Sequence, residues 1–292
     1  MDRSLKDSFG RPRQGWADLH LHTIYSDGVD PPQAVVQKAR KLGLQAIGIT
    51  DHDAVRGIAE AETAARPLGI EVVPGIELST SQDEADIHIL GYFIDPDNAR
   101  IRRYVQIFQE ERLRRAEKIV QKLKSIGVTV HLDLIVQKAG KGAIGRPHIA
   151  DALMEEGFVL SYDEAFYKYL AEGKPAYVPK FKISPLEGIE LIHAAGGLAF
   201  VAHPGMGLHL DQLIEFIKLG LDGIEILHPK HNLHTTNDLY QLAIKQGLLV
   251  SGGSDSHGER NGENNLGLFN VPYQFIEDMK SALQLRHAGN FG

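Results

Sequence analysis

Short runs of apolar residues recur along this chain, separated by longer stretches of mixed polarity. Seven runs stand out, at residues 17–22, 46–50, 71–74, 87–93, 198–202, 223–227 and 248–251. Most of them are continuously apolar instead of alternating, which is typical of parallel strands that are buried on both faces. The pattern therefore predicts seven short strands, most of them parallel.

The stretches between the runs have the features of helices. A helix predicted at 31–42 begins with two prolines and ends before Gly43, and the stretch 54–68 is rich in Ala and Glu. Further helices are predicted at 185–195, 210–219 and 233–246. Repeated strand-then-helix units indicate an α/β fold built on a parallel sheet or barrel.

This alternation is interrupted between residues 99 and 182. Here the sequence predicts a long Arg-rich helix at 101–126, followed by shorter helices at 132–138, 147–156 and 162–170. No strand pair is evident in this stretch. We therefore predict a flexible tail at 1–15, a discontinuous barrel domain at 16–98 and 183–286, and a helical insertion, or cap, at 99–182.

The composition narrows the class of protein. A chain of 292 residues with 43% hydrophobic content can bury a substantial core. It has no apolar run of about 18 residues, and its first residues lack the apolar centre of a signal peptide, so we expect a cytoplasmic protein. Because the chain has no cysteine, any metal must be bound by His, Asp or Glu, a donor set that suits Zn, Mn or Fe.

The net charge of −7 argues against general binding to nucleic acid, but the charge is unevenly distributed. Residues 99–182 contain 16 Lys and Arg against 10 Asp and Glu, whereas the remaining chain contains 15 against 28. Such a balance is expected if a basic insertion grips an anion that is drawn to cations in an acidic body. Solvated helix surfaces would give the same count, so the charge alone leaves both interpretations open.

Histidines and carboxylates gather where the apolar runs end. The set consists of His20, His22, Asp27, His52, Glu77, His88, His203, His228, Asp255 and His257. Because ligands bind at the carboxyl ends of strands in α/β sheets and barrels, these residues predict one polar cluster that holds several divalent cations. The pattern favours a metal-dependent hydrolase.

Some members of the set have a second interpretation. His20 and His22 share one strand face with Asp18, which could orient an imidazole, but paired histidines also serve structural roles. Asp27 lies in a Ser-Asp-Gly turn, where an Asp often stabilises the turn or caps a helix. His88 lies inside an apolar run and by itself is more typical of a buried, hydrogen-bonded histidine.

Two further positions favour a functional crevice. His52 and its neighbours Asp51 and Asp53 follow an apolar run directly, and three polar residues there are costly unless they face a crevice. Glu77 would be a poor core residue but a good bridging ligand between two cations.

The motifs H-x-H, S-D-G, T-D-H-D, G-I-E, I-H-I-L-G, A-H-P and G-S-D-S-H resemble, in order and approximate spacing, the PHP (polymerase and histidinol phosphatase) superfamily of metal-dependent phosphoesterases. The resemblance covers roughly residues 16–270. The insertion, with G-R-P-H and G-K-P-A-Y-V, is similar to the subgroup that hydrolyses nucleoside 3′,5′-bisphosphates, some members of which trim short RNAs from the 5′ end.

This resemblance implies a distorted (β/α)7 barrel with an inserted helical domain and two or three divalent metal ions. Mn is the metal that we expect, and Fe and Zn are the alternatives. It implies three ligand sets: His20, His22, Glu77 and Asp255; Glu77, His88 and His203; and Asp27, His52 and His257. Cations that share Glu77 would bridge a water and lower its pKa, which gives a hydroxide for in-line attack on phosphorus.

The phosphate oxygens also need a basic residue, because Arg binds them in a bidentate way. We expect Arg146 in this role, with His148 beside it and Lys174 as a weaker candidate. The alternative for Arg146 is an ordinary surface arginine before a helix. His228 is expected to donate a proton to the leaving group or contact phosphate, with His231 in reserve.

We therefore expect a phosphoesterase that removes the 3′-phosphate of nucleoside 3′,5′-bisphosphates, such as pAp to AMP, with 5′-3′ trimming of short single-stranded RNA as a further activity. The alternatives are a histidinol-phosphate phosphatase, a metal-binding module without activity and an amidohydrolase. The basic insertion argues against a histidinol-phosphate phosphatase, and the complete ligand set argues against an inactive module. The lack of a lysine near a mid-chain strand end argues against an amidohydrolase. We expect no membrane and no obligate protein partner.

Overall fold

The structure is a computed structural model that describes residues 15–82, 85–205, 208–259 and 265–289. The chain divides into two compact units, one formed by Met1–Arg102 with Ile183–Gly292 and the other by Arg103–Lys182. The predicted flexible tail at 1–15 lies, apart from Gly15, outside the described residues.

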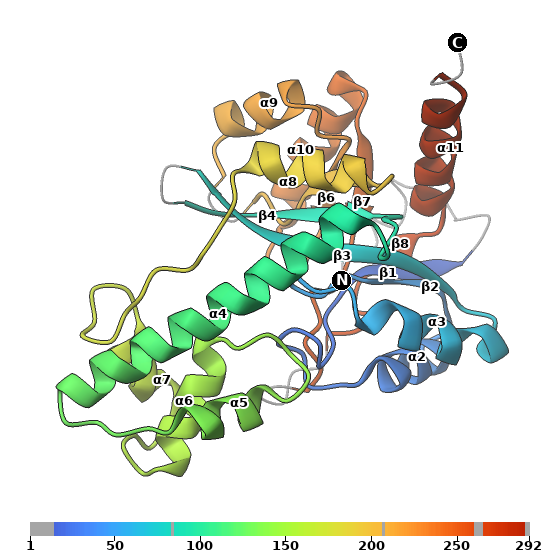
Figure 1. Ribbon diagram of the computed structural model, residues 1–292. Helices are drawn as coiled ribbons and strands as arrows, with labels where there is room; N and C mark the ends of the chain where they lie inside the picture. Colours follow the sequence, from blue (N-terminus) through green and yellow to red (C-terminus); the bar gives the residue numbers. More distant parts are fainter. Residues whose placement is uncertain (1–14, 83–84, 206–207, 260–264, 290–292) are drawn as a thin grey trace. The chain divides into compact units, whose positions relative to one another are not determined.

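The first unit contains an eight-stranded sheet (Figure 1). Its strands are β1 (Trp16–Leu21), β2 (Leu44–Ile49), β3 (Glu71–Gln82), β4 (Ala85–Tyr92), β5 (Leu198–Val201), β6 (Gly223–Leu227), β7 (Leu249–Gly252) and β8 (Val271–Pro272). Neighbours in the sheet follow the order β7-β6-β5-β4-β3-β2-β1-β8. The seven predicted strands are confirmed. The short strand β8, antiparallel to β1, was not predicted.

Most of the predicted strands pair in parallel, as expected, and β4 is the exception among them. β1–β2, β2–β3, β5–β6 and β6–β7 are parallel, but β4 is antiparallel to both β3 and β5. β3 also continues beyond the predicted 71–74, as far as Gln82, and forms a long hairpin with β4. A continuously apolar run did not reveal this, because β4 is buried over most of its length whatever its direction.

The sheet curves until β1 meets the segment that follows β7. Leu21 forms a parallel bridge with Ser256, and the amide of His22 donates a hydrogen bond to the Ser256 carbonyl at 3.0 Å. A Cβ atom at Gly253 would lie 2.3 Å from the Cβ atom of His20, so this close approach requires glycine. The first unit is therefore a nearly closed α/β barrel.

Helices connect most of the strands. They are α2 (Pro32–Lys41), α3 (Gly57–Ala65) with the 3-10 turn η1 (Arg66–Leu68), α8 (Pro185–Ala194), α9 (Leu210–Lys218), α10 (Leu233–Gln246) and α11 (Gln274–Gly289). Val36 of α2 and Ile58 of α3 belong to the same buried cluster as Ile47 and Ile49 of β2. Burial of these apolar faces is what fixes the helices on the sheet.

The second unit is helical. α4 (Ala99–Ser125) leads into it, and it contains α5 (Leu132–Ala139), α6 (Arg146–Glu155), α7 (Tyr162–Ala165) and the π-helix η2 (Phe166–Leu170). Ile119, Leu123, Ile135 and Leu153 are at the centre of its own core. Residues 103–182 contain no strand, as predicted.

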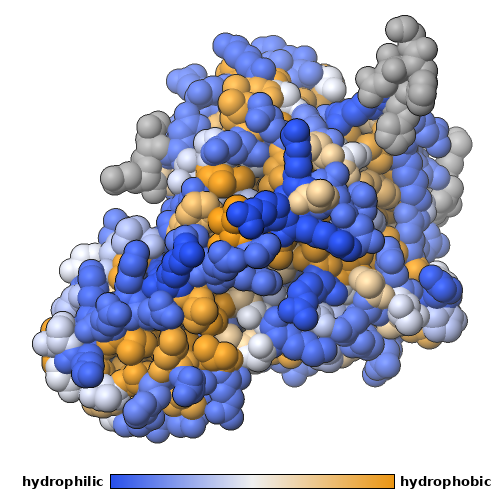
Figure 2. All heavy atoms as spheres, in the orientation of Figure 1, coloured by the Kyte–Doolittle hydropathy of each residue, from blue (hydrophilic) through white to orange (hydrophobic). Residues whose placement is uncertain are grey.

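The surface of the second unit is partly apolar. Figure 2 shows hydrophobic atoms gathered on one face of this unit, bordered by hydrophilic ones.

Among the described helices of the whole chain, none combines the length and the apolar character that a membrane span needs.

Candidate metal centre

The predicted ligands converge at one end of the barrel. The ring centroid of His22 lies 4.2 Å from that of His257 and 4.6 Å from that of His52. The rings of His88 and His203 are 5.3 Å apart. His22 and His257, which lie 235 positions apart in the sequence, are thus brought into one cluster by the order of the strands.

Glu77 does not follow the end of a strand as predicted, because it is inside β3, whereas His88 lies inside β4 as its apolar run indicated. The long hairpin that these strands form extends beyond the end of β2. Glu77 forms an isolated bridge with His52, the residue that follows β2 closely, and so reaches the level of the other ligands.

One group of candidate ligands surrounds an oxygen of Glu77. Glu77 Oε2 lies 3.1 Å from His20 Nε2 and 3.2 Å from His22 Nε2. Asp255 Oδ1 lies 3.1 Å from His22 Nε2 and 3.5 Å from His20 Nε2. These four residues have ligand atoms close enough to hold one cation, and they are the same four that the family resemblance implies.

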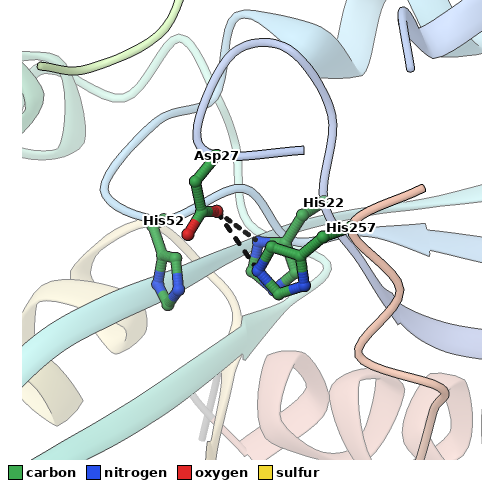
Figure 3. A group of neighbouring side chains, drawn as sticks. All are labelled: His22, Asp27, His52 and His257. Carbon is green, nitrogen blue, oxygen red and sulfur yellow. Dashed lines mark ion pairs between the residues drawn. The ribbon is translucent and has the colours of Figure 1, made fainter. Parts of the chain in front are cut away.

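A second group lies around Asp27 (Figure 3). The Asp27 carboxylate points between the ring of His52 and the stacked rings of His22 and His257. Asp27 Oδ1 is 3.3 Å from His257 Nε2 and 3.9 Å from His22 Nδ1. The structure thus adds His22 to the set of Asp27, His52 and His257 that the resemblance implies.

The third group is centred on the other oxygen of Glu77. Glu77 Oε1 lies 2.8 Å from His88 Nδ1 and 3.2 Å from His203 Nε2. His52 Nδ1 lies 3.1 Å from Glu77 Oε2, and His52, Glu77 and His88 are close enough together to hold a cation. The geometric group therefore contains His52 where the resemblance implies His203.

This donor set fits divalent cations. Four of its polar atoms are buried and make no hydrogen bond of regular geometry in the described structure: His22 Nε2, Asp27 Oδ1, His52 Nδ1 and His88 Nδ1. Each of them faces only other candidate ligands, at 2.8–3.3 Å. A cation between these groups would take the place of such contacts, and imidazole with carboxylate is a donor set that Zn, Mn and Fe accept.

The charges in the cluster are strongly coupled. Burial favours the neutral form of Glu77, but the imidazoles of His52, His20 and His88 outweigh it and hold the pKa of Glu77 well below its usual value. Burial also disfavours protonation of His22, but Asp255 and Glu77 raise the pKa of His22 to about 10. A cation that binds His22 must therefore displace its proton, so metal binding at this residue releases a proton.

Sequence reasoning missed Glu225, which lies inside the apolar strand β6. Its carboxylate is fully buried, accepts from the amide of His203 at 2.7 Å and lies 2.8 Å from His20 Nδ1. Asp18, which was expected to orient an imidazole, instead accepts from backbone amides such as that of Ser254 at 2.9 Å. A single acid within the run G-I-E-I-L was the signal that could have identified Glu225.

Asp51 and Asp53 hold the loop that carries His52. Asp51 accepts from the amide and the hydroxyl of Thr23, both at 2.7 Å, and so ties this loop to the one after β1. Asp53 accepts from the amide of Ser79 at 2.8 Å and from its hydroxyl at 2.7 Å, which ties the loop to β3. The two aspartates fix the position of His52 between its neighbours.

Backbone strain is concentrated near the cluster. His203 and Asp255 have positive φ angles of 33° and 50°, a region that costs a non-glycine residue about 1–3 kcal/mol. Such strain persists only where the surroundings determine the conformation, as the Glu225 bond to the His203 amide does here. The strained residues are candidate ligands, which suggests that the geometry is maintained for function.

His228 and His231 have different surroundings. His228 is buried, accepts from the amide of Lys230 at 3.2 Å through Nδ1 and lies 3.2 Å from Asp255 Oδ2 through Nε2. With Nδ1 accepting, Nε2 carries the proton and donates to Asp255. This favours a role in orienting Asp255, and proton donation to a leaving group stays a prediction.

The predicted substrate contacts Arg146, His148 and Lys174 belong to the second unit. Arg146 donates to the Leu170 carbonyl at 3.3 Å and lies over the ring of Phe166. His148 Nδ1 accepts from the amide of Gly145 at 3.1 Å and closes the first turn of α6. The ammonium group of Lys174 lies 4.5 Å from the ring centre of Tyr167. Contact with substrate stays a prediction for all three.

The barrel gathers many imidazoles and carboxylates around shared oxygens. This arrangement is typical of a metal-dependent hydrolase. Comparison with known proteins narrows the class to metal-dependent phosphoesterases, because the model of the PHP domain matches residues 18–220. The chain belongs to the PHP domain family.

Relatives of known name cover most of the chain. It is 34% identical to a 3′,5′-nucleoside bisphosphate phosphatase of Chromobacterium violaceum, over 86% of this chain and 90% of the relative. It is 35% identical to a 5′-3′ exoribonuclease of Haemophilus influenzae, over 82% of this chain and 89% of the relative. A solved structure from Bifidobacterium adolescentis, a predicted metal-dependent phosphoesterase, is 32% identical with a TM-score of 0.82, over 92% of this chain and 96% of that one.

Proposed function

We propose that this chain is a phosphatase that removes the 3′-phosphate of nucleoside 3′,5′-bisphosphates with the help of divalent cations. The observation that carries the proposal is Glu77, whose two oxygens lie within 3.2 Å of five imidazole nitrogens at the edge of a cavity of about 540 Å³. The similarity to the bisphosphate phosphatase of Chromobacterium violaceum supports the choice of substrate.

The residues divide into ligands and residues that orient them. His20, His22, Glu77 and Asp255 would hold one cation, Asp27, His52 and His257 a second, and His88 and His203 would complete a third with Glu77. Mn²⁺ is the ion that we propose first. Bound cations would lower the pKa of water in the site and neutralise phosphate oxygens as the ester bond breaks.

Buried carboxylates and histidines would keep these ligands in position before substrate arrives. Glu225 holds the imidazole of His20, and His228 holds the free oxygen of Asp255. Because such groups are fixed by the fold, little reorganisation is needed during the reaction. Arg146, His148 and Lys174 are kept in this proposal as residues of the second unit that bind the substrate.

The similarity to an exoribonuclease supports a second activity. The similarity to the Haemophilus influenzae exoribonuclease extends over 82% of this chain, so we also propose stepwise removal of nucleotides from the 5′ end of short single-stranded RNA.

The experiment is phosphate release by purified protein after its metal has been removed and replaced with Mn²⁺. We expect fast release from adenosine 3′,5′-bisphosphate and slower release from adenosine 3′-monophosphate, 5′-monophosphate and histidinol phosphate. A 5′-phosphorylated RNA of a few nucleotides tests the second activity, with mononucleotides as the expected product. If the Mn²⁺-loaded protein released phosphate from none of the esters, the proposal would be abandoned.

A further inference from the structure

The cavity beside the candidate metal centre contains a basic residue that the sequence did not single out. The described residues that line it all belong to the barrel unit, and among them Lys230 is the only lysine or arginine. The ammonium group of Lys230 forms no ion pair with the described residues. Its side chain is exposed, so the charge is available to a ligand that enters the cavity.

The loop that carries Lys230 is held firmly by the two histidines beside it. The amide of Lys230 donates to His228 Nδ1 at 3.2 Å, and the amide of His231 donates to the His228 carbonyl at 3.0 Å. His231 Nδ1 donates to the Ile226 carbonyl at 3.0 Å, while His231 Nε2 accepts from the amide of Gly205 at 3.1 Å. His231 therefore joins the loops after β5 and β6, and the Lys230 backbone is fixed before a ligand binds.

The same cavity has an apolar part that suits a nucleoside. Its volume of about 540 Å³ lies in the range of small-molecule sites. Apolar side chains line it from β4, β5 and the segment after β5: Ala85, Ile87, Val201, Pro204 and Leu208. Sugar and base can be covered by such a wall while phosphates remain near charged groups.

Charge explains why a bisphosphate needs Lys230 more than a monophosphate does. Each phosphate monoester carries a charge of about −1.5 to −2 at neutral pH. The cations in the cluster would neutralise the phosphate that is hydrolysed. A second phosphate in the same cavity would meet the carboxylates of Glu77, Asp86 and Asp255, and Lys230 is the lining residue that can offset this repulsion.

We propose that Lys230 forms an anion subsite that binds the phosphate that is not hydrolysed and thereby selects bisphosphates. This inference rests on the proposed function and adds a specificity-determining residue to it. It differs from the expectation for Arg146, because Lys230 is carried by the barrel itself.

The test compares Lys230→Met with the wild type on adenosine 3′,5′-bisphosphate and adenosine 3′-monophosphate, which differ only in the 5′-phosphate. Methionine keeps most of the length of the side chain and removes the charge. Loss of one charge-assisted hydrogen bond should lower kcat/KM for the bisphosphate about 10–100-fold, mainly through KM, and for the monophosphate less than about 3-fold. The KM of the variant for the bisphosphate should also rise less steeply with salt.

Two further variants provide the controls. Lys230→Arg restores the charge and should recover most of the selectivity. Lys245→Met removes an exposed lysine of α10 that does not line the cavity, and it should leave both substrates unaffected. Melting temperatures of all variants establish that they are folded.

The outcomes separate this inference from the proposed function. Suppose that the wild type hydrolyses both substrates. If Lys230→Met then lowers kcat/KM by the same factor for both, or lowers it for neither, the anion subsite is wrong and the phosphatase proposal stands. If the wild type hydrolyses neither, the proposed function fails and the subsite fails with it.

Discussion

Replacing Glu225 with Gln is expected to weaken metal binding while leaving the barrel folded, because the two side chains have nearly the same shape. The carboxylate of Glu225 makes two short contacts, to the His203 amide at 2.7 Å and to His20 Nδ1 at 2.8 Å. A Gln side chain can keep only one of them in its present form. If its oxygen stays on the His203 amide, its NH₂ group faces His20 and pairs only with an unprotonated Nδ1.

That pairing would move the ring proton of His20 to Nε2, the nitrogen that lies 3.1 Å from Glu77 and faces the candidate cation. A protonated Nε2 is a donor and no longer a ligand. In the other orientation of the amide, two N–H donors would face each other across 2.7 Å. Loss of a group that orients a ligating histidine costs about 10–100-fold in metal affinity or activity, which corresponds to about 1.4–2.7 kcal/mol.

The assay is a calorimetric titration of the metal-depleted protein with Mn²⁺, followed by kcat of the loaded protein. The matched control is Glu190→Gln, which makes the same change on the exposed face of α8. We expect the control to equal the wild type and Glu225→Gln to bind Mn²⁺ about 10–100-fold more weakly. Wild-type Mn²⁺ affinity in a folded Glu225→Gln protein would refute the tautomer argument.

Three other predictions follow from the same structure. Glu77→Gln should lower kcat about 1000-fold or more and reduce the number of bound ions, measured by elemental analysis, because Glu77 belongs to two of the candidate groups; unchanged turnover would contradict its role. Arg146→Ala should keep the metal content but destabilise the protein by about 1–2 kcal/mol in chemical denaturation, since it removes the Leu170 hydrogen bond and the Phe166 ring contact. A larger decrease in kcat/KM for bisphosphates than for monophosphates would support the predicted contact of Arg146 with substrate. Equal decreases would exclude that contact. The pKa of His22 is raised from 6.5 to about 10, so its contribution to the stability of the metal-free protein is fully present below pH 6.5 and is lost as the pH rises towards 10; Mn²⁺ should therefore raise the melting temperature more at pH 8 than at pH 6, and an equal rise at both would be inconsistent with proton displacement.

The elements of this fold were accessible from the sequence because they depend on local patterns. The seven apolar runs became strands, and the helix at 233–246 begins and ends where the pattern placed it. The long helix at 99–125 and the absence of strands in 103–182 agree with the same kind of reasoning. The spacing of apolar residues that produces a buried helix or strand face is a local pattern, so it can be recognised in a single sequence.

The direction of a strand was not accessible in the same way. β4 pairs antiparallel with β5, from Ile89↔Val201 to Tyr92↔Leu198, although the two strands are separated by more than one hundred residues that include the helical unit. A buried strand is apolar in either direction, so its composition carries no signal of how it pairs. Only the assembled sheet decides it.

The candidate ligands were likewise found from the sequence, since histidines and acids at the ends of apolar runs are unusual and their positions along the chain are visible. Their grouping was not. Which imidazole faces which oxygen of Glu77 depends on the side-chain positions at the end of the nearly closed barrel. His52 lies beside Oε2 of Glu77, whereas His88 and His203 lie beside Oε1.

The sequence by itself determined that this chain has α/β units, a helical insertion and a set of candidate imidazole and carboxylate ligands, because each of these depends on residue types and their spacing. The tertiary structure alone decided which buried groups support those candidate ligands. Glu225 lies 205 positions from His20 in the sequence, and the contact between them follows from strand order and packing across the barrel. The exposed Lys230 is placed at the cavity in the same way, by a loop that the hydrogen bonds of His231 fix. Such contacts join residues that no local pattern relates.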